Sequence, residues 1–183
     1  MKYKLAQFIT HVVFLTLLTT GTVFAGGDYF MVSDVGASAQ TIRMGNIEGF
    51  NNMASSMFEN PAALSRVHRV SISAFTTTIM NEVAFKNMAV ATKTPVGIIG
   101  FGYMSAGVSG IPYTYENNTD NGTSSEFAVD HYFEYNNTMA KICYEFSRDR
   151  NMHFGVSAVY YNTTLDTYTG QGYNFDAGML MDL

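Results

Sequence analysis

The second half of this chain alternates apolar and polar residues with a period of two, a pattern that builds β-strands and not helices. Residues 152–164 show the alternation best, with one mainly apolar and one mainly polar set: Phe154, Val156, Ala158 and Tyr160 against His153, Gly155, Ser157, Tyr161 and Thr163. Val159 interrupts it. Similar runs cover 139–147 and 173–183, and weaker ones cover 69–80, 83–93 and 97–107. We therefore predict an all-β fold with about six strands.

The connections between these runs differ in length. Residues 94–96 and 148–151 suit tight turns, whereas 108–130 is long, polar and rich in Gly, Asn, Ser and Thr, and we predict a loop there. Short turns on one side and long loops on the other are typical of an up-and-down membrane barrel, and runs of roughly 9–13 residues fit tilted strands that cross a bilayer. Tyr and Phe near the run ends favour aromatic girdles, although aromatic residues are common in any strand. The pattern predicts a transmembrane antiparallel up-and-down β-barrel.

The composition excludes several classes of protein. Charged residues make up 14%, well below the roughly 25% of an average soluble domain, while 47% are hydrophobic. A disordered chain would be charged and poor in aromatic residues, whereas this one has 12 Tyr and 14 Phe. Because 10 Lys+Arg face 15 Asp+Glu without a basic patch, we expect no nucleic-acid partner. The single cysteine, Cys143, excludes an internal disulfide framework and a cysteine-based zinc site.

The first 25 residues have the order of a secretory signal peptide. Lys2 and Lys4 form a basic start, 12–18 is a short apolar core, and Val23-Phe24-Ala25 places small residues where a signal peptidase cleaves. The alternative is an uncleaved anchor, but the apolar stretch falls short of the ~20 residues that a spanning helix needs. We predict export, cleavage near Ala25, and a mature protein in the cell outer membrane, in contact with membrane lipid.

The stretch 26–66 between the signal and the first strand differs from the rest. From residue 34 onward it carries small residues, Met and polar groups without a period of two. Asn60-Pro61 followed by Ala62 is typical of an N-cap and a first-turn proline that open a short helix. We predict that 26–66 forms an irregular or helical hatch that plugs the barrel, and that 67–183 supplies its strands.

Three motifs in this stretch follow one another in a characteristic order. They are Gly36-Ala37-Ser38-Ala39, Met44-Gly45, and the run 57–64 that contains Asn60-Pro61-Ala62. This order resembles the opening of outer-membrane barrels related to long-chain fatty-acid transporters (FadL-like), closest to the PorV/PorQ branch. The resemblance implies a roughly 14-stranded barrel with an N-terminal hatch, to which Met44, Gly45, Asn60, Pro61 and Ala62 belong. It also implies inward movement of hydrophobic compounds, or a role as an outer-membrane component of a protein secretion system. Ala63 departs from the family, which commonly has Gly there.

About six strands are too few for such a barrel, because known barrels need about eight strands to close around their side chains. An open edge in lipid leaves backbone N–H and C=O groups without partners, at several kcal/mol each. Three explanations remain: the chain is a fragment of a longer barrel, other copies complete it, or strands hide in 26–66 or 108–130. We favour a fragment.

Candidate chemistry in the sequence is sparse. His68, His131 and His153 lack the spacing of metal ligands, so we expect no metal and no cofactor. The glycine-rich run 97–102 is not a dinucleotide fingerprint, and we interpret its glycines as allowing a bend or a bulge. Lys141, Glu145 and Asp176 fall in the polar phase of their strands, which predicts that they face the lumen. No catalytic constellation emerges, and we expect no enzyme.

Three functions remain open. The first is an outer-membrane barrel that takes up or passes hydrophobic small molecules, favoured by a hatch ahead of strands with one apolar phase. The second is a non-enzymatic, PorV-like scaffold or secretion-system subunit that binds a protein partner, favoured by the resemblance. The third is a soluble exported β-sandwich or adhesin, suggested by the Asn- and Thr-rich stretch 108–130.

Overall fold

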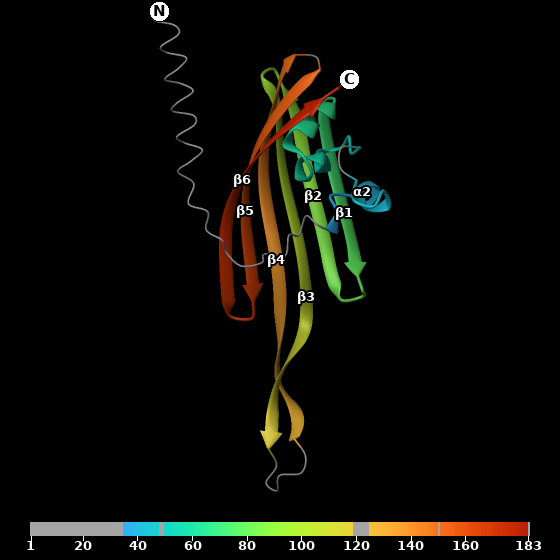
Figure 1. Cartoon of the computed structure of the whole chain (residues 1–183). Coiled ribbons are helices and arrows are strands. Elements are labelled where there is room, and N and C mark those ends of the chain that lie inside the picture. The colour runs from blue at the N-terminus through green and yellow to red at the C-terminus, as the bar shows by residue number, and fades with distance from the viewer. Residues whose placement is uncertain (1–34, 48–49, 119–124, 150, 183) are drawn as a thin grey trace, which may run out of the picture. The chain divides into compact units, whose positions relative to one another are not determined.

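Six strands form one antiparallel sheet in the computed structural model, which describes residues 35–47, 50–118, 125–149 and 151–182 (Figure 1). The strands are β1 Val70–Ile79, β2 Val83–Thr94, β3 Gly97–Asn118, β4 Ser125–Asp149, β5 Met152–Leu165 and β6 Tyr168–Met181. Each strand pairs with the next one in the chain, so the sheet is up-and-down. The predicted antiparallel fold and number of strands are confirmed. The predicted signal peptide at 1–25 lies outside the described residues.

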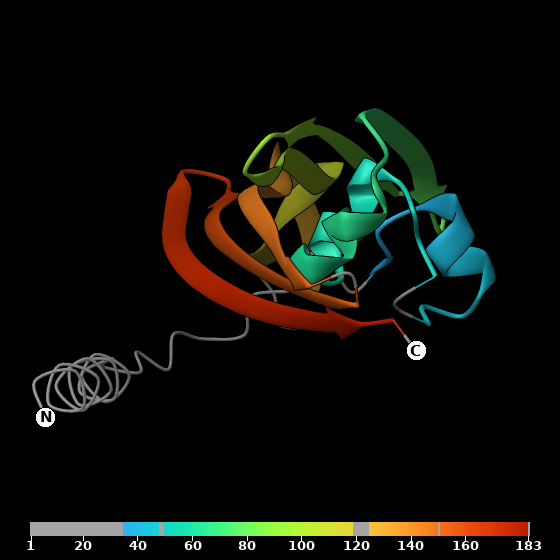
Figure 2. The ribbon, with the colours of Figure 1, turned by 90° about the horizontal axis from the view of Figure 1, so that it is seen from above.

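The sheet curls (Figure 2), and its two faces differ in burial and in the side chains that they carry. On the convex face, large apolar side chains from all six strands are exposed, for example Ile72, Met88, Phe101, Ile142, Val156 and Phe175. On the concave face, apolar residues such as Phe85, Met104 and Met139 form a core with the hatch segment, and polar or charged residues such as Lys141 and Glu145 are buried beside them. Val159, which interrupts the alternation in the sequence, is buried on this face beside Lys141 on β4. The sheet therefore packs its concave face against a mixed core and also exposes large apolar side chains on its convex face.

The sheet does not close on itself. Among the described strands, β1 pairs only with β2 and β6 pairs only with β5. Both outer strands therefore present an edge of unpaired backbone groups. Such edges template pairing with further strands unless something covers them.

The predicted loop at 108–130 is wrong for most of its length. β3 and β4 continue through it as a two-stranded ribbon, paired from Val108 and Tyr135 as far as Asn118 and Ser125, and only 119–124 lie outside the described residues (Figure 1). Register shifts interrupt the pairing between Val108 and Ile111 and between Tyr113 and Thr114. The sequence misleads here because these register shifts break the period-two alternation, while the two strands still satisfy each other's backbone.

The segment ahead of the sheet, which we call the hatch segment (35–47 and 50–66), contains three short helices: α2 Ala39–Arg43, η2 Ala54–Phe58 and η3 Pro61–Arg66. Asn60 caps η3 and Pro61 occupies its first turn, which confirms the predicted helix start. η2 packs against β2 and β3, and η3 packs against β4, β5 and β6, within the curve of the sheet (Figure 2). Within the described part of the chain, no helix is both long enough and apolar enough to cross a membrane.

Candidate functional site

Glycines on the concave face let the hatch segment approach the strands closely. A Cβ atom at Gly155 would overlap the backbone of Pro61 and Ala62, and one at Gly178 would overlap the side chain of Asn60. On β3, a Cβ at Gly102 would collide with the ring of Phe58. The interpretation of a bulge in run 97–102 is wrong, because the β2–β3 register is uninterrupted there. These glycines provide space for the hatch segment.

Polar side chains fix the hatch segment to the sheet. The Asn60 side-chain oxygen accepts from the Ala62 N–H at 2.9 Å, and its Nδ2 donates to the Met179 carbonyl of β6 at 3.2 Å. Asn87 of β2 donates from Nδ2 to the Ala37 carbonyl at 2.6 Å. Because these bonds join segments far apart in sequence, they orient the hatch segment as well as stabilise it.

We expect Asn60→Ala to lower the free energy of unfolding by about 1–2 kcal/mol, because it removes the helix cap together with the bond to β6. Asn60→Asp keeps an oxygen for the cap but has no N–H for the Met179 carbonyl. Its free energy of unfolding should therefore fall between those of wild type and Asn60→Ala. Denaturant unfolding in detergent micelles measures both variants. Equal stability of all three proteins would contradict this role for Asn60.

A buried ion pair lies beneath the hatch segment. Lys141 Nζ lies 2.8 Å from Asp176 Oδ2, and the lysine side chain is only 6% exposed. The aspartate also accepts from Ser157 Oγ at 2.9 Å and from Asn174 Nδ2 at 2.7 Å. The carboxylate therefore has three donors, and the ammonium has a charged partner. A buried charge with such partners avoids most of the cost of desolvation.

A second cluster of charged groups runs toward η3. Glu145, 2% exposed, accepts from Ser147 Oγ at 2.9 Å and lies 3.3 Å from His153 Nδ1. His153 Nε2 lies 3.4 Å from Asp182 Oδ2, and Arg66 Nη2 of η3 lies 3.9 Å from Asp182 Oδ1. Ser147 Oγ also lies 2.9 Å from His153 Nδ1, so this hydroxyl bridges the histidine and Glu145. The cluster therefore links β4, β5 and the chain after β6 to the hatch segment.

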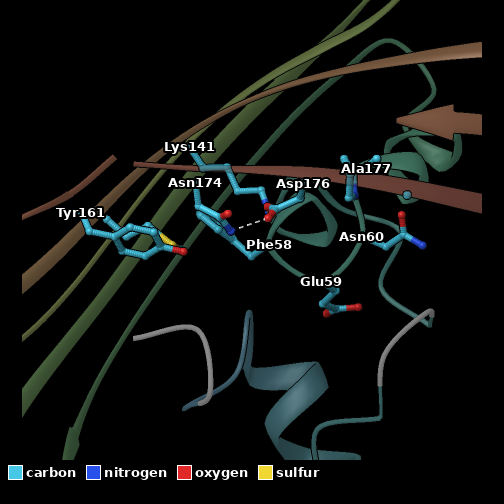
Figure 3. A pocket seen from close by; sticks show the side chains of 11 residues that line it. Phe58, Glu59, Asn60, Lys141, Tyr161, Asn174, Asp176 and Ala177 are labelled. Carbon is cyan, nitrogen blue, oxygen red and sulfur yellow. Dashed lines mark hydrogen bonds and ion pairs between the residues drawn. The ribbon is translucent and has the colours of Figure 1, made fainter. Parts of the chain in front are cut away.

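A pocket of about 350 Å³ opens between the start of η3 and strands β4 to β6 (Figure 3). Its lining combines apolar and polar side chains: Phe58, Glu59, Asn60, Pro61, Met139, Lys141, Tyr161, Asn174, Asp176, Ala177 and Gly178. Figure 3 shows Lys141, Asn174 and Asp176 pointing toward one another. Glu59 is held by Thr41 Oγ1, which donates to its Oε1 at 2.7 Å. The pocket can therefore cover an apolar body and position a polar end.

The structure brings some of the predicted site residues together and separates others. Asn60, Pro61, Lys141 and Asp176 line the pocket. Glu145 belongs to the second cluster, and Ala62 is a buried residue of η3. Met44 and Gly45 follow helix α2 and do not line the pocket. Gly45 has φ +72°, a left-handed conformation that favours glycine after a helix.

Sequence reasoning missed several residues of this site. Asn174 and Ser157 share the polar phase with Asp176 and Lys141, so the alternation held a signal for them. Tyr161 falls in the same set of 152–164 as Ser157, whereas Glu59 and Phe58 gave no such signal, because their role depends on how the hatch segment docks.

No metal site is apparent: within the described ranges, no three His, Cys, Asp or Glu side chains are grouped to hold an ion. The concave face offers charged and hydrogen-bonding groups beside apolar side chains, an arrangement that can bind a small ligand. Comparisons with protein-family models, curated proteins and solved structures found no match to this chain.

Proposed function

We propose that this chain forms part of an outer-membrane β-barrel whose hatch-covered interior passes hydrophobic small molecules. The observation that carries the proposal is the set of large apolar side chains exposed on the convex face, opposite a concave face that buries the Lys141–Asp176 ion pair and packs against the hatch segment. In a membrane barrel the convex face meets lipid and the concave face lines the lumen. The FadL-like resemblance of the hatch motifs points to the same class.

The apolar column on β6 illustrates the fit to a bilayer. Its convex positions from Tyr173 to Met181 are all exposed, and Phe175 reaches 81%. Eight residue steps of strand span about 27 Å at ~3.4 Å each, comparable with the ~25 Å apolar band of outer-membrane barrels. In water such a surface would drive association, whereas in lipid it is solvated.

The open edges of β1 and β6 require cover in a membrane, since each unpaired backbone group there costs several kcal/mol. Further antiparallel strands, from additional sequence or from other copies, would complete the wall. β1 and β6 run antiparallel, so a β6 edge can pair with a β1 edge in the same up-and-down order.

The membrane assignment is testable with single tryptophans, because the chain has none. Phe175 and Asn174 are neighbours on β6 that face opposite sides of the sheet. We expect the fluorescence of Phe175→Trp to be quenched strongly by lipids with brominated acyl chains, and that of Asn174→Trp to be quenched little. Equal quenching of both variants, or recovery of the wild-type chain from cells without detergent, would contradict the membrane assignment.

The same two variants test passage of hydrophobic molecules. Asn174 lines the pocket, so a tryptophan there should narrow it and weaken the binding of a fluorescent fatty-acid probe by about tenfold, equivalent to ~1.4 kcal/mol. Phe175→Trp, on the convex face, serves as the matched control and should bind like wild type. Absence of saturable binding by the folded wild-type chain would contradict this function.

The second candidate function is a non-enzymatic scaffold that binds a protein partner, and the β3–β4 ribbon is the observation that favours it. The ribbon extends past the ends of the neighbouring strands and exposes aromatic side chains (Figure 1). A protein that co-purifies with the chain from outer membranes would support this candidate. This result would distinguish it from the first candidate, because passage of hydrophobic compounds does not require a protein partner.

A further inference from the structure

The ribbon differs from the rest of the chain in charge. Between 108 and 135 the sequence has five acidic residues and no Lys or Arg: Glu116, Asp120, Glu126, Asp130 and Glu134. Of the described side chains in this set, Glu116, Asp130 and Glu134 are all exposed. Asp130 lies 3.0 Å from His131 Nδ1, and because this part of the sequence has no Lys or Arg, a cationic partner gains free energy from these carboxylates.

One face of the ribbon is also apolar and uncovered. Along β4, Tyr132, Val129 and Phe127 share this face and are 68%, 48% and 71% exposed. This face of the ribbon continues the convex face of the sheet. Asn136 and Glu134 lie between its apolar residues and those of the six-stranded part. An aromatic strip rimmed by charges is typical of a protein-binding surface.

The ribbon has free edges. The register of β3 with β2 ends at Gly107, and that of β4 with β5 ends at Tyr135, so each ribbon strand pairs on one side only. On the β3 edge, Pro112 lacks an N–H, which makes that edge the poorer template. The β4 edge, residues 127–133, has no proline, and it can accept an added strand on either side of Asp130, where the register shifts.

We propose that the β4 edge of the ribbon binds an extended, Lys- or Arg-rich polypeptide segment by strand addition, with the acidic side chains pairing its cations and the aromatic strip covering its apolar residues. A second copy of this chain is disfavoured, because it would bring the same acidic charges to the edge. An anionic lipid surface is disfavoured for the same reason. The proposal does not depend on the passage of hydrophobic molecules.

Labelled synthetic peptides test the proposal against the full chain folded in micelles of a zwitterionic detergent. The probe alternates Lys with Val, one control peptide replaces every Lys by Glu, and another carries backbone N-methyl groups along one edge with the Lys kept. We expect the Lys peptide to bind about tenfold or more tightly than either control, with affinity that falls as salt rises. Equal binding of the N-methylated peptide would overturn strand addition.

Two double variants locate the site. Asp130→Asn/Glu134→Gln should weaken binding of the Lys peptide severalfold, while Glu82→Gln/Asp166→Asn, which removes two exposed carboxylates from the neighbouring hairpin turns, should not. Equal loss in both variants, or none in the first, would overturn the ribbon as the site. Binding of Ca²⁺-loaded anionic vesicles that competes with the peptide and is lost in the first variant would reassign the surface to lipid.

Discussion

Replacing Gly155 with alanine is expected to detach η3 from the sheet. The added Cβ would overlap the backbone of Pro61 and Ala62, and backbone cannot move aside as the end of a flexible side chain can. Overpacking of this kind typically costs about 1–3 kcal/mol, and we expect the upper end because the contact is backbone to backbone. Hydrogen exchange of 54–66 should therefore accelerate about 100-fold while the strands stay protected.

Gly172→Ala is the matched control for this result. Gly172 also lies on the concave side, paired with Tyr161, but a Cβ there would meet nothing within 4 Å. Its hydrogen exchange over 54–66 should match wild type. If both variants behave alike, then Gly155 is not the site at which the hatch segment is held.

Removing the carboxylate of Asp176 is the second change with a large expected effect. Asp176→Asn leaves the ammonium of Lys141 without its charged partner at a position that is 6% exposed, and should lower the free energy of unfolding by about 3 kcal/mol. Lys141→Met should cost less, because Asp176 is 31% exposed and keeps its bonds from Ser157 and Asn174.

The double variant Lys141→Met/Asp176→Asn separates a pair effect from two independent losses. If the ion pair carries the cost, the double variant should be more stable than Asp176→Asn alone, since no unpaired charge is left buried. Urea unfolding of the four proteins in micelles measures the coupling. Costs that simply add would contradict a direct interaction.

The alternation of side chains predicted much of this fold, but only where it runs without interruption. The runs at 152–164 and 173–183 predicted β5 and β6, because their apolar phase marks both the strand and its orientation. In the ribbon at 108–118 and 125–135, register shifts interrupt the alternation, so its strands looked like a loop. Its strands are held by backbone pairing with each other, which side-chain patterns do not record.

The candidate site divides in the same way. The polar phase placed Lys141, Glu145 and Asp176 on one face, where the structure also has them. The choice of Asp176 for Lys141, and of His153 for Glu145, depends on register across strands and could not be read from spacing. The role of the glycines of β3 and β5 could not be predicted from the sequence either, because the hatch residues that need their space lie some forty to ninety positions earlier.

The sequence by itself determined that this chain builds antiparallel strands with an apolar and a polar face, and that a helix starts at Asn60, because period-two patterning and capping are local chemistry. Only the tertiary structure decided that the hatch segment docks on the polar face, which charges pair beneath it, and that the pocket forms at its edge. Those outcomes depend on contacts between residues distant in the chain. Such contacts contribute to stability only once the sheet has curled and the hatch segment has packed into it.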